Sequence, residues 1–172
     1  MRIFVVGTGR CGTVTFSKAC EYMTNYTTGH ESHAGRVGDF DYPDNHIEVD
    51  SRLVEVITIL KQRYPDALFV HLIRTNREAC LRSMAARKNQ DVYARLHFDA
   101  KSDGDKDRRR AAEIRYAEYN ARIPLLAPGC RTMHLESIKG EWCTFWHHIR
   151  AKGHMAKSIK EWDTRHNASF EA

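Results

Sequence analysis

The opening of the chain, residues 1–24, constrains the fold more than any other segment. An apolar run over residues 2–6 is typical of a buried strand, the turn from Gly7 to Gly12 is rich in glycine, and a helical pattern begins at Thr13. A strand, a glycine loop and a helix N-terminus in this order bind phosphate, because the loop N–H groups point inward and the helix dipole adds roughly half a positive charge. The segment therefore predicts an α/β fold with an anion site after its first strand.

The loop differs from the two common nucleotide-binding patterns. The P-loop G-x-x-x-x-G-K-[ST] has a lysine and then a hydroxyl after its second glycine, whereas Thr13 and Val14 stand at these positions. The run from Gly7 to Gly12 matches G-x-G-x-x-G, but no clear acidic residue ends a second strand about 20 residues later to bind a ribose. The strong cation of the loop is Arg10, and a guanidinium binds an oxyanion without a metal ion. A turn that only joins the strand to the helix is the alternative.

Two motifs resemble those of sulfotransferases that use 3′-phosphoadenosine 5′-phosphosulfate (PAPS). The run Gly-Arg-Cys-Gly-Thr, from Gly9 to Thr13, is similar to the loop that binds the 5′-phosphosulfate in that family. The apolar run 68–73 leads to Arg74 and then to a helix that carries Ser83, which is similar to the family's 3′-phosphate motif. The motifs stand in the family's order, each at a strand end. The resemblance, to small sulfotransferases of bacterial or viral type, covers the first half of the chain well and the remainder loosely.

The resemblance implies a cofactor and the residues that bind it. PAPS would be the donor, 3′-phosphoadenosine 5′-phosphate (PAP) the product, and no metal ion would be required. The residues expected to bind the 5′-phosphosulfate are Gly9, Arg10, Cys11, Gly12, Thr13 and Val14. Arg74 and Ser83 are expected to bind the 3′-phosphate, and Arg165 to close over it. Because the separation of Arg74 from Ser83 is slightly longer than is usual in the family, Arg82 is the alternative to Ser83.

The general base is expected among the polar residues that follow the first helix. By resemblance to sulfotransferases of the heparan-sulfate type, which carry a catalytic glutamate there, Glu31 is the first candidate. Cytosolic sulfotransferases carry a catalytic histidine at the end of the next strand, where Asp50 stands. His30 is a further candidate, as the base or as the residue that orients Glu31, and Glu48 shares a strand face with Asp50. Arg10 would stabilise the leaving phosphate. The alternative for either carboxylate is an ion pair with an arginine.

Histidines and cysteines suggest two other chemistries. A metal site of His30, His33 and His46 is conceivable, but it matches no standard zinc spacing. The five cysteines are odd in number and contain no C-x-x-C pair, which favours reduced thiols in a cytoplasmic protein over a disulfide framework. Cys11 is an alternative nucleophile, because its loop is electropositive.

Alternating strand and helix patterns predict one domain, residues 1–172, with a parallel sheet and helices on both faces. This three-layer α/β arrangement is that of P-loop proteins and of sulfotransferases, and its ligands bind at the carboxyl ends of the strands. The expected strands cover residues 2–6, 46–50, 67–73 and 131–135. The expected helices cover residues 13–24, 52–63, 77–88 and 108–122. Residues 25–45 are expected to be irregular, and residues 89–107 to form a charged surface loop.

Capping and burial patterns refine these helices. Ser51 and Asn76 are the expected N-caps, and Pro124 is expected to end the helix that begins at Arg108. The residues expected to be buried are Leu53, Val54, Ile57 and Leu60 in one helix, Ile114, Ala117 and Ala121 in another, and Trp142, Phe145, Trp146 and Ile149 near the end of the chain.

The composition suits an enzyme with anionic ligands. The formal net charge is +5 and the pI is about 9.0, a balance that favours anions and would equally suit nucleic acid. No apolar stretch is long enough to span a bilayer, and no signal peptide precedes the strand that begins at Arg2. We therefore expect a cytoplasmic protein without a membrane span.

The expected function is the transfer of a sulfuryl group from PAPS to a hydroxyl, or an amine, of a small-molecule, carbohydrate or lipid acceptor. No nucleic-acid partner is expected. This transfer needs an in-line acceptor, a general base and cations on the leaving phosphate. One alternative is a small nucleotide or metabolite kinase with a degenerate P-loop, which would need ATP and Mg²⁺. Another is a non-catalytic module that binds PAP or nucleic acid.

Overall fold

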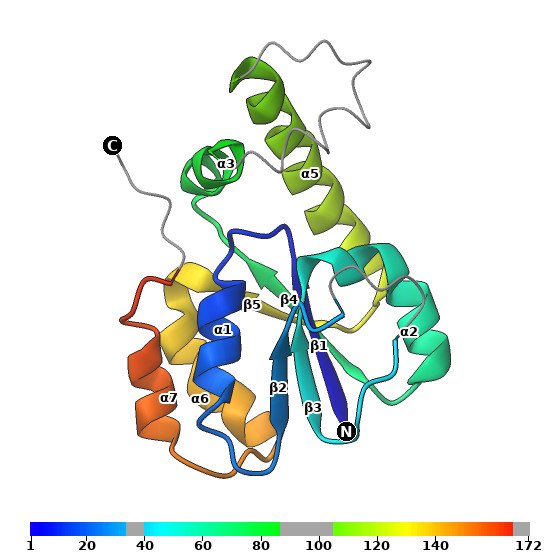
Figure 1. Ribbon diagram of the computed structural model, residues 1–172, viewed down its shortest axis with the longest axis vertical. Coiled ribbons are helices and arrows are strands. Elements are labelled where there is room, and N and C mark those ends of the chain that lie inside the picture. Colours follow the sequence, from blue (N-terminus) through cyan, green and yellow to red (C-terminus); the bar gives the residue numbers. More distant parts are fainter. Residues whose placement is uncertain (34–39, 87–104, 167–172) are drawn as a thin grey trace.

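A computed structural model describes residues 1–33, 40–86 and 105–166 of the chain. The described residues form one parallel sheet with the strand order β2-β3-β1-β4-β5 (Figure 1), which confirms the predicted fold class. The strands are β1 (Arg2–Gly7), β2 (Thr27–His30), β3 (His46–Val49), β4 (Leu68–Ile73) and β5 (Arg131–His134). The strand β1 lies in the middle, with β2 and β3 on one side of it and β4 and β5 on the other. The strand order therefore reverses at β1, and such a point is where open α/β sheets bind ligands.

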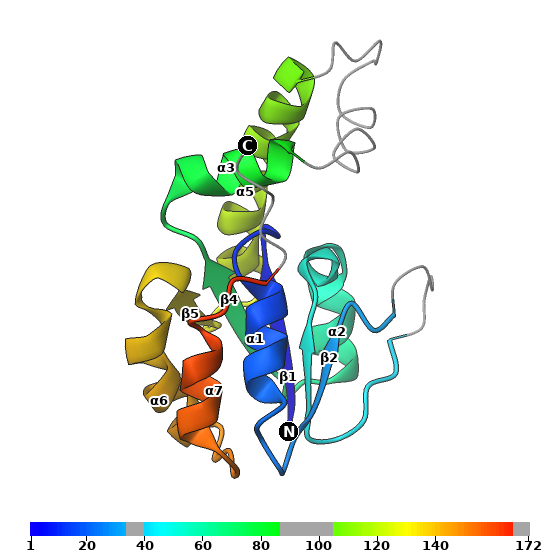
Figure 2. The ribbon, with the colours of Figure 1, turned by 60° about the vertical axis from the view of Figure 1, so that its left-hand side comes forward.

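Helices cover both faces of the sheet and make three layers (Figures 1 and 2). They are α1 (Thr13–Cys20), α2 (Ile57–Arg63), α3 (Arg77–Ala85), α5 (Asp105–Leu126), α6 (Ile138–His148) and α7 (Met155–Glu161), with short 3-10 turns η1 (Ser51–Val56) and η2 (Leu135–Ser137). Ile3 and Val5 of β1 lie in the core under α1, α6 and α7. Phe4 and Val6 lie in the core under α2 and α5. This alternation follows the two-residue period of a strand that is buried on both faces.

A third, smaller core lies beyond the sheet. Cys80, Leu81 and Met84 of α3 pack against Ala112 of α5. In Figure 1, α3 and the first half of α5 lie above the carboxyl ends of the strands. This packing holds α3 next to the turn that follows β1, so the helix that carries Ser83 lies at the carboxyl edge of the sheet.

The predicted core is largely confirmed. The residues that are buried as predicted are Leu53, Val54, Ile57, Leu60, Trp142, Phe145, Trp146 and Ile149. The predicted cap of α3 is also confirmed, because Asn76 Oδ1 accepts a hydrogen bond from the Ala79 N–H at 3.0 Å. Both features have strong local signals, an apolar stripe and a capping residue, which explains why the sequence predicts them.

The prediction of an irregular segment over residues 25–45 is wrong for Thr27–His30, which form the edge strand β2. This strand lacks an apolar alternation, and its backbone pairing with β3 defines it instead. An added Cβ at Gly29 would come within 2.1 Å of Ser32 Oγ and 2.4 Å of Glu48 Oε2, so these side chains would have to move to admit a larger residue. A short polar strand at the edge of a sheet therefore escapes detection by hydrophobic periodicity.

The end of α1 and the start of the helical segment after β3 also differ from the prediction. The helix α1 ends at Cys20, earlier than expected. The cap of the following helical segment is Asp50 and not Ser51, because the Asp50 carboxylate accepts a hydrogen bond from the Arg52 N–H at 2.8 Å. The first turn after Asp50 is a 3-10 turn, and α2 begins only at Ile57. Asp50 therefore has a structural role that the sequence analysis assigned to its neighbour.

The long helix α5 begins earlier and ends later than predicted. It spans 22 residues and passes through Pro124, which lies in its last turn and interrupts only the end of the hydrogen-bond ladder. The predicted inward face is wrong: Ala117 and Ala121 are exposed and Ile114 is only partly buried. The buried residues are Ala111, Ala112, Tyr119 and Ile123. Tyr119 and Ile123 pack in the core with α2, and Ala112 packs against α3. Most of the predicted loop at 89–107 lies outside the described residues.

None of the helices in the described ranges combines the length and the apolar character needed to cross a membrane.

Candidate functional site

The glycine loop joins β1 to α1 at the carboxyl edge of the sheet. Gly9, Arg10 and Gly12 have positive φ angles of 78°, 56° and 94°, so the chain coils tightly. An added Cβ at Gly7 would come within 2.5 Å of the Leu72 carbonyl oxygen, which shows how closely the loop approaches β4. Arg10 is the informative residue, because a non-glycine residue in the left-handed region costs about 1–3 kcal/mol and such residues cluster at functional sites.

Three of the predicted cofactor residues meet beside this loop. Arg10 Nε donates a hydrogen bond to Ser83 Oγ of α3 at 2.8 Å. Arg74, which follows β4, donates a hydrogen bond from Nη1 to the Arg10 carbonyl oxygen at 3.4 Å. Arg10, in the turn after β1, thus contacts both the residue that follows β4 and a residue of α3. Guanidinium and hydroxyl groups are the donors that bind phosphate and sulfate oxygens.

The orientation of α3 distinguishes Ser83 from Arg82. Ser83 is half-buried and contacts Arg10, whereas Arg82 is exposed. The turn between Arg74 and α3 consists of Thr75 and Asn76, and Asn76 is the cap of the helix. The residue that faces the glycine loop is therefore the serine.

Thiols pack behind the loop. Cys11 and Cys80 are buried, and Cys80 Sγ donates a hydrogen bond to the Gly9 carbonyl oxygen at 3.7 Å. Burial raises the pKa of the Cys11 thiol to about 12, so the group stays protonated. This argues against the alternative that Cys11 is a nucleophile. All five cysteines are free.

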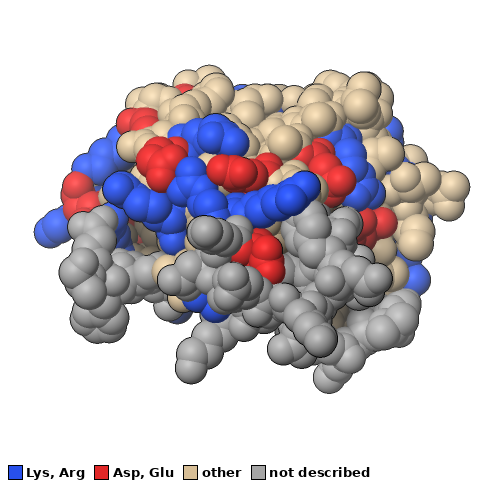
Figure 3. All heavy atoms as spheres, turned by 90° about the horizontal axis from the view of Figure 1, so that it is seen from above, with Lys and Arg blue, Asp and Glu red and all other residues tan. Residues whose placement is uncertain are grey.

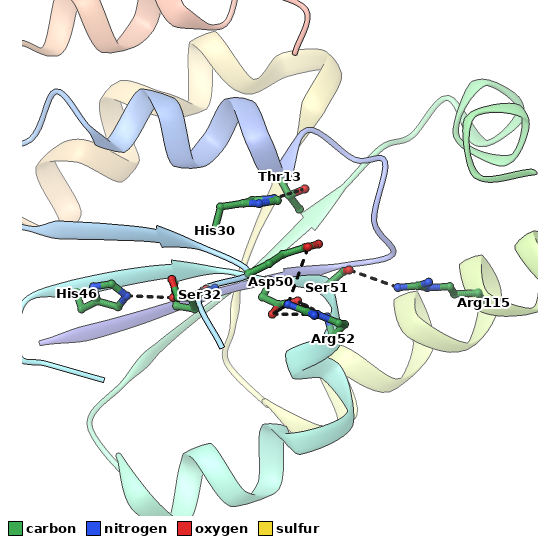
Figure 4. A network of polar contacts seen from close by, with 10 residues as sticks. Thr13, His30, Ser32, His46, Asp50, Ser51, Arg52 and Arg115 are labelled. Atoms are coloured by element: carbon green, nitrogen blue, oxygen red, sulfur yellow. Dashed lines mark hydrogen bonds and ion pairs between the residues drawn. The ribbon is translucent and has the colours of Figure 1, made fainter. Parts of the chain in front are cut away.

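On the other side of the loop, the first turn of α1 contacts β2. His30 Nε2 lies 3.3 Å from Thr13 Oγ1 (Figure 4). Thr13 is the first residue of α1 and follows Gly12, whose position as N-cap provides no side-chain hydrogen bond. Val14 is the next residue of this turn and is half-buried. His30 is therefore in contact with the junction of the loop and the helix.

The two predicted carboxylate bases both lie next to Arg52. Asp50 is buried, and its oxygens accept hydrogen bonds from Arg52 Nε at 3.0 Å and from Nη2 at 2.7 Å (Figure 4). Glu31 has a half-exposed side chain and lies 3.9 Å from the same guanidinium. The alternative of an ion pair with an arginine thus applies to both residues. Both oxygens of Asp50 are therefore engaged by the Arg52 guanidinium, whereas Glu31 makes one longer contact with it.

Glu48 belongs to a separate buried network. Its Oε2 lies 3.1 Å from His46 Nε2, and its Oε1 accepts a hydrogen bond from the Ser32 N–H at 3.0 Å. Burial raises the pKa of the Glu48 carboxyl, but the hydrogen bonds from His46 and Ser32 outweigh this and leave the pKa below its ordinary value. His46 also contacts Thr27 Oγ1 at 2.8 Å. Glu48 therefore joins β3 to β2 and to the turn after it.

The conceivable metal site of His30, His33 and His46 is not formed. His30 contacts Thr13, and His46 contacts Glu48. Within the described ranges, no three side chains of His, Cys, Asp or Glu lie close enough together to hold a metal ion.

Arg115 of α5 reaches the loop without any sequence signal. Its Nη2 donates a hydrogen bond to Ser51 Oγ at 3.3 Å (Figure 4) and lies 3.8 Å from the position of an added Gly9 Cβ. Its guanidinium also lies 5.0 Å from the centre of the Tyr119 ring. The sequence analysis missed Arg115 because an arginine in a charged helix has no local pattern that marks a distant contact.

Glu136, in η2 after β5, was missed for the same reason. Its Oε2 accepts hydrogen bonds from the Thr75 N–H at 2.9 Å and from Thr75 Oγ1 at 2.7 Å, and its Oε1 accepts one from the Asn76 N–H at 2.9 Å. One carboxylate therefore binds the turn that directly follows Arg74.

The end of the described chain closes on the loop through aromatic packing. An added Cβ at Gly12 would come within 2.7 Å of Leu135 Cδ1 and 3.6 Å of Trp162 Cζ3. Trp162 also packs edge-on against Phe16 of α1, with ring centres 5.9 Å apart. A depression of about 450 Å³ lies beside Trp162 at the start of α6. Arg165, which was expected to close over the 3′-phosphate, is exposed just beyond this point.

Positive and negative charges alternate around the site. Figure 3 views the molecule from above the carboxyl edge and shows a band of Lys and Arg side chains with Asp and Glu between them. Arg109 of α5, for example, contacts Glu78 at 2.7 Å and Glu113 at 3.1 Å. Local ion pairs therefore offset part of the net positive charge on this described face.

No family model matches the chain, and a comparison with characterised proteins finds no match either. A functional assignment therefore depends on the geometry of the site and on the two motifs.

Proposed function

We propose that the chain is a sulfotransferase that moves a sulfuryl group from PAPS to a hydroxyl, or an amine, and releases PAP. The observation that carries this proposal is the meeting of Arg10, Arg74 and Ser83 beside a left-handed glycine loop. The motif resemblance assigns phosphate-binding roles to these same residues. Arg10 is far in the sequence from Arg74 and Ser83, so its contacts with these two residues support the assignment independently of the motifs.

The chemistry of PAP explains why this contact matters. PAP carries its two phosphates on one ribose, so the two anion subsites of a PAP site must lie side by side. The loop and Arg10 would bind the 5′-phosphosulfate, and Arg74 and Ser83 the 3′-phosphate. The hydrogen bond between Arg10 and Ser83 meets this requirement. A site for a ligand that lacks a 3′-phosphate would not need Arg74 and Ser83.

The transfer needs a base on the side of the loop away from Arg74. The acceptor oxygen attacks sulfur, the bond between sulfur and the 5′-phosphate oxygen breaks with its electron pair on PAP, and the acceptor proton passes to the base. We assign this role to His30, because its ring contacts Thr13 at the end of the loop. Glu31 is second, since it lies beside Arg52, and Asp50 is last, since Arg52 binds both of its oxygens.

The acceptor is assigned only by class. It would approach over β2 and β3 and would be a hydroxyl of a small molecule, a carbohydrate or a lipid. A cytoplasmic location belongs to the same proposal and is supported by the five free cysteines. PAPS needs no metal ion for this chemistry, and Thr13 and Val14 replace the lysine and hydroxyl with which P-loop kinases bind phosphate and Mg²⁺.

Calorimetric titration of PAP without metal, beside ATP with Mg²⁺, tests the proposal. We expect PAP to bind and Arg10→Ala and Arg74→Ala each to weaken it by about ten- to a hundredfold, the loss of charge-assisted hydrogen bonds. Arg82→Ala and Arg63→Ala are matched controls that should leave binding unchanged, since Arg82 is exposed on α3 and Arg63 ends α2, away from the loop. Binding of ATP with Mg²⁺ but not of PAP would refute the sulfotransferase and favour the kinase.

A further inference from the structure

The turn between β4 and α3 is held from two sides. From one side, Glu136 accepts three hydrogen bonds from Thr75 and Asn76. From the other side, Tyr116 of α5 donates a hydrogen bond from its hydroxyl to the Arg74 carbonyl oxygen at 3.0 Å. The backbone on both sides of the Arg74 side chain is therefore fixed by groups from distant elements.

The Glu136 contacts act on both residues of the 3′-phosphate subsite. Thr75 directly follows Arg74, so its N–H sets the direction in which the Arg74 side chain leaves the turn. Asn76 caps α3, and α3 carries Ser83. Each contact is a charge-assisted hydrogen bond, which is stronger than one between neutral groups. One carboxylate thus sets the position of Arg74 and the start of the helix that positions Ser83.

A second carboxylate on the same segment provides a natural comparison. Glu141 of α6 accepts hydrogen bonds from the His134 N–H at 3.1 Å and from Ser137 Oγ at 2.5 Å. Like Glu136, it lies near the end of β5 and binds backbone and hydroxyl donors. These contacts stay within its own segment, whereas those of Glu136 cross to the turn after β4. The two glutamates therefore differ in whether they reach the anion site.

We infer that Glu136 is a positioning residue for the 3′-phosphate subsite. It does not touch the ligand, and it acts through the geometry of Arg74 and Ser83. This inference rests on the proposed function, since it assumes that Arg74 and Ser83 bind the 3′-phosphate of PAP. Its consequence is specific: loss of Glu136 lowers affinity for PAP and leaves affinity for AMP, which lacks the 3′-phosphate, unchanged.

The test is the ratio of PAP to AMP affinity in Glu136→Gln, Glu136→Asp and Glu141→Gln. Residues that orient metal-ligating side chains typically contribute ten- to a hundredfold in affinity, and by analogy we expect Glu136→Gln to lower the ratio by about tenfold. Glu136→Asp keeps the charge and should fall between wild type and the glutamine variant. Glu141→Gln, the matched control, should leave the ratio at the wild-type value. A lowered stability with an unchanged ratio in Glu136→Gln would show a merely structural role and overturn the inference.

A double-mutant cycle with Arg74→Ala identifies the residue through which Glu136 acts. In the Arg74→Ala background, we expect Glu136→Gln to change the ratio much less than it does in the wild type. Fully additive effects would overturn the inference. A wild-type protein that binds PAP no better than AMP would refute the proposed function itself. A wild-type preference for PAP that survives in Glu136→Gln would refute only the role of Glu136, so the two failures are distinguishable.

Discussion

The two sides of the glycine loop differ in the contacts that their arginines make. On the nucleotide side, beside β4 and α3, Arg10 and Arg74 donate hydrogen bonds to a hydroxyl and a carbonyl oxygen. On the acceptor side, beside β2 and β3, Arg52 donates to the carboxylate of Asp50. The proposed nucleotide side thus brings two guanidinium groups next to the loop, whereas on the acceptor side a guanidinium binds a carboxylate.

This difference matches the different demands of binding and of proton transfer. A multiply charged anion binds where cationic side chains gather. A general base must accept a proton from the acceptor hydroxyl, and an excess of positive charge nearby would oppose that protonation. The nucleotide side is thus suited to hold PAP, and the acceptor side is suited to place a histidine near an incoming hydroxyl. Substitutions on the two sides should therefore affect different measured quantities.

The largest effect is expected at the loop that separates the two sides. Gly12→Ala should abolish PAP binding and lower the free energy of unfolding by about 2–4 kcal/mol, because a Cβ meets Leu135 at a positive φ. Gly140→Ala, at a helical position with open space around the added Cβ, is the matched control and should be neutral or slightly stabilising. Calorimetry and chemical denaturation measure both. Retained PAP binding in Gly12→Ala would mean that the loop is not the anion site.

The next effect separates turnover from binding. His30→Ala should lower the turnover of PAPS with an acceptor by about 10²- to 10⁴-fold, the usual contribution of a general base, while PAP affinity stays unchanged. His147→Ala, on the exposed face of α6, is the control and should leave both quantities unchanged. Steady-state rates with an acceptor found by screening, together with calorimetry, check this. A parallel loss of PAP affinity in His30→Ala would remove the division between the two sides.

A smaller effect, on stability alone, is expected at Asp50. Asp50→Asn keeps the helix cap and loses the charge that binds Arg52, so the free energy of unfolding should fall by about 1–2 kcal/mol with PAP affinity unchanged. Asp44→Asn, which breaks an exposed ion pair with Arg2, should change it by less than about 0.5 kcal/mol. Urea denaturation measures both variants. A turnover loss as large as that of His30→Ala would instead identify Asp50 as the base.

The smallest effect concerns pH. Because the pKa of Glu48 is lowered in the folded protein, this group contributes stability above its unfolded pKa, and the contribution is lost as pH falls through the folded pKa. Glu48→Gln should therefore flatten the acid limb of the curve of unfolding free energy against pH, below about pH 5. Glu55→Gln, which removes an exposed carboxylate paired with Arg122, should leave that limb unchanged. Equal slopes for wild type and Glu48→Gln would contradict the prediction.

The nucleotide side was predictable because its signals are local. An apolar strand followed by a glycine turn and a helix predicts the loop, and a second apolar strand that leads to Arg74 predicts the other end of the site. The register of α3 was the uncertain step. Packing of Cys80, Leu81 and Met84 against α5 turns Ser83 toward Arg10. That packing depends on a helix that is distant in sequence, so the choice between Ser83 and Arg82 required the structure.

The acceptor side was less predictable because its structure depends on pairing and not on pattern. The strand β2 is polar and is defined by its partner β3, so no periodicity reveals it. Asp50 was one candidate for the base, and it is also the cap that the sequence analysis assigned to Ser51, because Ser and Asp cap helices about equally well. Arg115 and Glu136 make long-range contacts that local sequence does not encode. Sequence reasoning thus pointed to Arg10, Arg74 and Ser83, which the structure brings together, but it did not find the residues that support them.

The packing of Leu135 and Trp162 around Gly12 affects when the glycine loop can reach its final structure during synthesis. Leu135 and Trp162, which pack against the loop, follow it far along the sequence, so they emerge from the ribosome after it. Domains generally fold as units during synthesis. The loop therefore receives this packing only after the segment that carries Trp162 has emerged. A nascent chain that ends before Leu135 lacks these contacts around Gly12, so the proposed anion site takes its final form after translation has passed this segment.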